Sequence, residues 1–67
     1  MYIVQELQTN NSQTSLLPAN TYADRNLAES AYHAKLSAAA VSTVEVHTVV
    51  MYDEHGNMVM RDFYEHI

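Results

Sequence analysis

The second half of the chain changes from a helical to a strand-like apolar pattern, which predicts a helix followed by a β-hairpin. Between about residues 22 and 40, small apolar residues recur at helical spacing, at Leu27, Ala31, Ala34, Ala38 and Val41. From residue 43 onward, β-branched residues dominate and apolar positions alternate. The only glycine, Gly56, permits the positive φ of a tight turn. We therefore predict a hairpin over residues 43–64, with its turn at about residues 53–57.

The first third of the chain predicts one strand and one long loop. Residues 2–8 begin with the strand formers Tyr2, Ile3 and Val4. Residues 9–21 are mostly polar and contain the only proline, so we predict a loop that either packs back onto the core or contacts a partner. The segment Thr21 to Asp24 has the spacing of a capping box, which sets the expected start of the helix at about residue 22.

The resulting element order, β-α-β-β, predicts a two-layer α+β fold that forms a single domain over residues 1–67. The expected fold packs the helix, through its Leu27–Val41 stripe, on a three-stranded and mainly antiparallel sheet. The even positions of residues 44–52 then face the helix. We expect the returning hairpin strand in the middle of the sheet, antiparallel to the first strand. The alternative pairs the first strand parallel to the strand from residue 43, through a right-handed crossover.

One helix covers only one face of such a sheet, so several apolar side chains are left without cover. Exposed apolar patches usually mark interfaces. A domain of this size buries only about 60% of its unfolded surface and is marginal alone. We therefore predict a homo-oligomer, a dimer or higher. The predicted oligomer or partner interface consists of Tyr32, Leu36, Val49, Met51, Met58, Met60 and Phe63.

The acidic composition narrows the classes of partner. Eight carboxylates face three lysines and arginines, for a net charge of -5. Direct nucleic-acid binding is disfavoured because it needs clustered cations. An acidic surface suits a basic partner, and the alternative interpretation is that the charge only keeps the domain soluble. No apolar run reaches the roughly 18 residues of a membrane span, and no basic segment precedes the first apolar residues as in a signal peptide. We expect a cytoplasmic protein with no membrane contact.

Residues that suggest chemistry are few. The four histidines lack the spacing of a metal site, so we expect them on the surface, with neither metal nor cofactor bound. Glu45 and His47 share a strand face, but such pairs are common in an acidic chain. We expect no enzyme and assign no catalytic residue. Between the subunits of an oligomer, aromatic rings and arginines suit a small phosphate-bearing ligand, and the candidate contacts are Tyr22, Arg25 and Arg61, beside Tyr32.

Three segments carry a resemblance to known proteins: MYIVQELQTN, AESAYHAKLSAAAVS and VEVHTVVMYDEHGNMV. They are similar to short uncharacterised proteins encoded in phage and prophage genomes of Gram-positive bacteria. The resemblance implies a small binding protein that acts by stoichiometric contact, as an inhibitor of bacterial defence or a sponge for its signalling ligand. The alternative is a virion structural or assembly component, and an orphan enzyme is the residual alternative.

Overall fold

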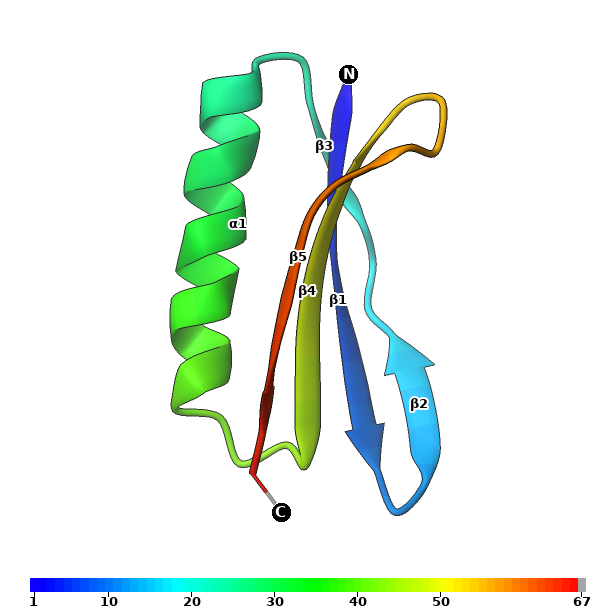
Figure 1. Ribbon diagram of the computed structural model, residues 1–67, viewed down its shortest axis with the longest axis vertical. Coiled ribbons are helices and arrows are strands. Elements are labelled where there is room, and N and C mark those ends of the chain that lie inside the picture. The colour runs from blue at the N-terminus through cyan, green and yellow to red at the C-terminus, as the bar shows by residue number, and fades with distance from the viewer. Residues whose placement is uncertain (67) are drawn as a thin grey trace.

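The computed structural model describes residues 1–66 and shows an α+β fold, with one helix across one face of a five-stranded antiparallel sheet (Figure 1). The sheet order is β2-β1-β4-β5, and β3 also pairs with β1. The last residue, Ile67, lies outside the described residues. The elements are β1 (Tyr2–Asn10), β2 (Gln13–Leu16), β3 (Asn20–Tyr22), α1 (Arg25–Ala40), β4 (Val46–Asp53) and β5 (Met58–Glu65).

The predicted three-stranded β-α-β-β arrangement is too small, because two more strands precede the helix. Both lie in residues 9–21, which were expected to form a loop. A two-residue turn at Asn11 and Ser12 folds the chain back onto β1, and both residues have positive φ, 52° and 63°. That conformation is typical of a tight hairpin, and asparagine tolerates it better than most residues.

The central strand next to β1 is β4, so both predicted strand orders are wrong. β1 and β4 are antiparallel, with registers from Tyr2↔Asp53 to Thr9↔Val46, and β5 pairs with the other side of β4. The apolar content of the strands explains this order. Val49 and Met51 of β4 are fully buried. The returning strand β5 carries charged side chains, which are common on edge strands, at Arg61, Asp62 and Glu65.

The helix begins at Arg25, not at residue 22, because Asp24 is its N-cap. The Asp24 carboxylate accepts a hydrogen bond from the Asn26 backbone N–H at 2.7 Å, which satisfies one of the free amides of the first turn. Thr21, the expected cap, belongs to β3 instead. Gly56 has the positive φ that was expected of the hairpin turn, 85°.

The helix packs through a different face from the predicted one. Ala28, Tyr32 and Ala39 are buried, whereas Leu27 and Val41, the two ends of the predicted stripe, are 60% and 84% exposed. The predicted stripe is mostly alanine between those ends. The strip that contains Tyr32 has more apolar surface to remove from water, so burying it contributes more free energy.

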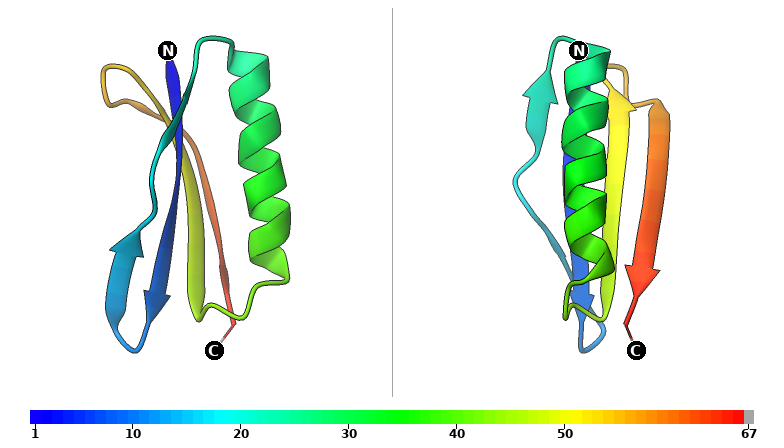
Figure 2. Two further views of the ribbon diagram at one scale, coloured as in Figure 1. Left: turned by 180° about the vertical axis from the view of Figure 1, so that it is seen from behind. Right: turned by 90° about the vertical axis from the view of Figure 1, so that its left-hand side faces the viewer.

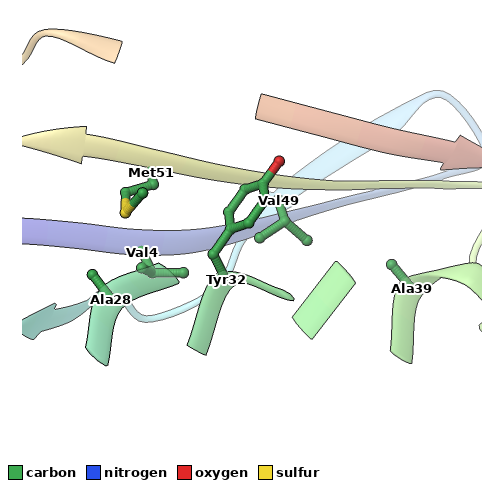
Figure 3. Packing of buried hydrophobic residues seen from close by; sticks show 6 residues of the cluster. All are labelled: Val4, Ala28, Tyr32, Ala39, Val49 and Met51. Carbon is green, nitrogen blue, oxygen red and sulfur yellow. The ribbon is translucent and has the colours of Figure 1, made fainter. Parts of the chain in front are cut away.

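The side chains that the strands turn toward the helix are also the opposite set from the predicted one. In β4 the odd positions lie under α1, and the even positions, expected there, lie on the other face. The Tyr32 ring lies beside Val49, while Val4 and Met51 lie near Ala28 (Figure 3). The helix is seated over β1 and β4, with β5 to one side and β3 to the other (Figure 2), and β2 pairs with the edge of β1 that faces away from β4.

The helix rotation leads to a stability prediction with a matched control. We expect Tyr32→Ala to lower the free energy of unfolding by about 3–5 kcal/mol, because it leaves a cavity beside Val49. In a domain this small, that loss leaves much of the protein unfolded at 25 °C. Leu27→Ala should change the free energy of unfolding by less than about 0.5 kcal/mol. Urea titrations followed by circular dichroism measure both values, and equal losses would contradict the observed packing.

Candidate functional site

The sheet face turned away from α1 has no second layer over it within residues 1–66, and we call it the open face (Figure 1). Antiparallel partners point to the same side of a sheet, so the strand registers define its members. They are Ile3, Gln5, Leu7, Thr9, Thr14, Leu16, Thr21, Val46, Thr48, Val50, Tyr52, Met58, Arg61, Phe63 and Glu65.

The centre of the open face is closely packed, and exposed apolar side chains lie around this centre. Val50, which lies between its register partners Gln5 and Arg61, is only 8% exposed. Towards the margins, Leu16 is 67%, Met58 61% and Phe63 44% exposed. These side chains come from β2 and β5, on opposite sides of the central strands. Exposed apolar side chains that gather on one face are typical of a protein interface.

A glutamine holds the centre of the open face in place. The Gln5 Nε2–H group donates to the Leu17 carbonyl at 3.0 Å, and the Tyr52 hydroxyl donates to Gln5 Oε1 at 3.4 Å. The first bond ties the segment after β2 to β1, and the second orients the Tyr52 ring. Both the β1–β2 hairpin and the β4–β5 turn bend to the side away from α1 (Figure 1). The open face is therefore bordered at its two ends.

The β4–β5 turn at one of these ends is built around a carboxylate. Asp53 Oδ1 accepts from the backbone N–H groups of Asn57 and His55, each at 2.9 Å. Asp53 Oδ2 accepts from the Asn57 side-chain amide at 3.2 Å. The hydrogen bonds from Asn57, backbone first, lower the pKa of Asp53 below its ordinary 3.8, because they favour the charged carboxylate.

The lowered pKa of Asp53 determines how the stability of the fold should change with pH. A carboxyl group whose pKa is lower in the folded state stabilises the fold above pH 3.8 and loses that contribution as pH falls through the folded pKa. We expect Asp53→Ala to melt at a lower temperature than the unmodified protein at neutral pH. That difference should shrink in acid. Thermal melts from neutral pH into acid test this expectation. Asp53→Asn keeps one acceptor oxygen, so it should melt at a temperature between those of Asp53→Ala and the unmodified protein. A pH-independent difference would contradict the charged role.

The predicted interface residues are divided between the core and the surface. Tyr32, Val49 and Met51 are in the core, and Leu36 and Met60 are partly buried against it, so these side chains are used within the chain. Their assignment as surface residues followed from the wrong helix face and the wrong strand parity. Only Met58 and Phe63 of that set lie on the open face.

Tyr32 is an ionisable residue within the apolar core. Burial raises the pKa of its hydroxyl above the ordinary 10.0, and the carboxylate of Asp62 on β5 raises it further, because both disfavour the phenolate. A raised pKa means that the folded state holds the proton more tightly than the unfolded state. The contribution to stability is therefore complete below pH 10.0 and is lost as pH rises through the folded pKa.

We therefore expect Tyr32→Phe to reduce the loss of stability above pH 10, while changing the free energy of unfolding little at neutral pH. The variant keeps the ring and removes only the hydroxyl. Urea titrations at neutral pH and at about pH 11 provide the comparison. Leu27→Ala serves as the control, because it should retain the full alkaline loss. An unchanged alkaline loss in Tyr32→Phe would contradict the assignment.

A polar cluster lies under the helix, on the side opposite the open face. Glu6 accepts from His47 Nε2 at 3.1 Å and forms an ion pair with Lys35 Nζ at 3.4 Å. His47 is only 5% exposed, so the expectation that it lies on the surface is wrong. Its Nδ1 atom has no hydrogen-bond partner among the described residues. The cluster links α1 to β1 and β4. The pairing of Glu6 with His47 depends on strand register, for which the local sequence contains no signal.

The pair of Glu45 and His47 does not form as drawn from the sequence. The Glu45 carboxylate instead accepts from the Asn11 backbone N–H at 2.7 Å, and the Asn10 side chain accepts from the Glu45 N–H at 3.1 Å. Glu45 therefore fastens the β1–β2 turn to the start of β4. No group of three or more metal-binding side chains gathers within residues 1–66.

The residues proposed for a small ligand do not converge within one chain. Tyr22 is half-buried against the core on the helix side of the sheet. Arg25 is 53% exposed in the first turn of α1 and pairs with Glu29 at 3.3 Å. Arg61 lies on the open face, opposite Val50. The sheet itself separates Arg61 from the other two.

His66 makes a contact that sequence analysis missed. Its Nε2 lies 3.1 Å from the carbonyl of Ala40, the last helical residue, and its Nδ1 lies 2.9 Å from the Val44 carbonyl. The two contacts place the ring between the last turn of α1 and the segment before β4. His66 therefore joins the end of β5 to the end of α1.

The comparisons with known proteins assign the chain to no family. No protein-family model, no curated protein and no solved structure matches the chain. Within the described residues, no helix combines the length and the apolar character needed to cross a bilayer. The function of the chain therefore has to be inferred from its surfaces, and above all from the open face.

Proposed function

We propose that the chain is a small binding protein that acts by stoichiometric contact through its open face. The observation that carries this proposal is the set of exposed apolar side chains on the helix-free face, led by Leu16 and Met58. Within one chain these side chains remain in water, and a protein partner would remove them from it. The face is broad and nearly continuous from β2 to β5, which suits another protein surface.

The charge of the chain supports a particular chemistry for the partner. A net charge of -5 favours a partner with a basic rim around an apolar centre. The resemblance to proteins encoded in phage genomes supports a bacterial defence protein as the class of target. In that setting the bound protein inhibits its target by occupying a surface. A ligand sponge is less well supported, because Tyr22 and Arg25 lie on the opposite side of the sheet from Arg61.

The proposal is tested with two leucines of similar exposure on opposite sides of the molecule. Leu16 lies on the open face and is 67% exposed, and Leu27 lies on the outer side of α1 and is 60% exposed. We expect Leu16→Glu to reduce the binding of a partner at least about tenfold, because it places a charge in a desolvated contact, and Leu27→Glu to bind normally.

The experiment uses immobilised protein and lysate from a Gram-positive bacterium, with mass spectrometry of what is retained. A specific partner is one that unmodified protein and Leu27→Glu both retain and that Leu16→Glu loses. Its retention should also fall as salt is raised, because charge steers the contact. A partner lost equally by both variants, or by neither, would contradict the role of the open face. Recovery of the chain in purified virions would instead support the structural alternative.

A further inference from the structure

The outer edge of β5 is a second unpartnered surface, separate from the open face. β5 pairs with β4 on one side only, and most of its residues are exposed. The opposite edge of the sheet is divided between the short strands β2 and β3, and Pro18 lies between them. Such an interruption prevents continuous pairing there. Among residues 1–66, β5 is therefore the continuous edge that is open to another strand.

The bonds between β4 and β5 determine which backbone groups of β5 point outward. The His66 N–H donates to the Glu45 carbonyl at 2.7 Å. Bonded and non-bonded pairs alternate along an antiparallel ladder, so the even-numbered residues of β5 bond to β4. The Phe63 N–H is consistent with this alternation, because it donates to the Asp62 carboxylate at 2.8 Å and not to a carbonyl of β4. The N–H and C=O groups that point outward belong to Arg61, Phe63 and Glu65.

We propose that β5 pairs with β5 of a second copy of this chain, antiparallel and in the register that places Phe63 opposite itself. In this register Arg61 lies opposite Glu65 of the second copy, and Glu65 lies opposite Arg61. Both side chains are exposed, and neither takes part in an ion pair within the described part of the chain. All three residues with outward backbone groups then form bonded pairs, which supply the attraction, while the opposite charges set the register.

Other two-fold registers are less favourable for electrostatic reasons. A register centred on Arg61 or on Asp62 places like charges directly opposite each other. A register centred on Tyr64 would place Asp62 opposite His66, but the His66 ring is already bonded to the carbonyls of Ala40 and Val44. The register centred on Phe63 avoids both conflicts, and it packs a ring that is 44% exposed against its copy.

Asp62 regulates access to this edge. Its bond to the Phe63 N–H occupies one of the amides that the second copy needs. Pairing therefore requires the Asp62 carboxylate to turn away. In the proposed register Asp62 lies opposite Tyr64 of the second copy, whose hydroxyl is a replacement donor. The bond within one chain thus competes with dimer formation and should weaken it.

The dimer joins the two sheets without covering their open faces. A two-fold axis that relates antiparallel edge strands is perpendicular to the sheet, so both helices lie on the same side. The two open faces then form one surface, with Phe63 at its centre. The dimer rests on the β5 edge and does not require the proposed function, so each can fail without the other.

A charge-exchange cycle tests the register. Sedimentation equilibrium between about 10 µM and about 1 mM should show the monomer giving way to twice its mass. R61E and E65R each place like charges opposite one another twice, and each should raise the dimer Kd at least about tenfold. The double variant R61E/E65R restores opposite charges, and its Kd should return to within about threefold of the original. Circular dichroism verifies that all the variants are folded.

A single-cysteine variant tests the geometry directly, because the chain has no cysteine of its own. Bonded partners in an antiparallel ladder have Cα atoms about 5.5 Å apart, which is within the range of a disulfide. F63C should therefore form a covalent dimer on mild oxidation. M58C is the control, since its two copies would be roughly 30 Å apart. A monomer mass at every concentration would overturn the dimer, and equal crosslinking of both variants, or no rescue in R61E/E65R, would overturn the register.

Discussion

The pairing of β1 with β4 is the constraint on which the rest of the structure depends. Its register places Val4 opposite Met51 and thereby assigns every side chain of the central strands to one face or the other. A shift by one residue would exchange the two faces. The observed register puts Val49 and Met51 under α1, where Tyr32 closes the core. The same register puts Val50 on the open face, so one pairing determines both the core and the candidate interface.

The sequence predicted the kinds of element better than their orientation. A helix, a hairpin with Gly56 in its turn and a strand at the start of the chain were all expected and observed, within a few residues at their ends. The helix face was not predictable with certainty, since alanines make two of its strips apolar and Tyr32 marks only one. The parity of β4 was equally ambiguous because valine occurs at both parities, at Val46, Val49 and Val50.

Strand order and the polar contacts depend on long-range geometry, which local patterns do not contain. The approach of Glu6 to His47 joins residues from two strands whose partnership the chain order leaves open. The hairpin turn at Asn11 and Ser12 was hidden because polar residues suit a loop as well as a tight turn. The prediction that one face of the sheet lacks a helix depended only on counting elements. For that reason the uncovered sheet face was predicted correctly, whereas most of the residues that were predicted to lie on it lie elsewhere.

The two edges of the sheet are unlike, and this difference has a consequence for how copies of the chain can accumulate. A sheet with two continuous free edges can add strands at both and in that way grow into a fibre. Here the edge beyond β1 is divided between β2 and β3, with Pro18 in the gap. Growth can therefore begin at one side only and has no site from which to continue. An edge dimer of this β-rich chain would therefore have no continuous edge left, and the interruption at Pro18 lies beside Leu16, at the margin of the open face.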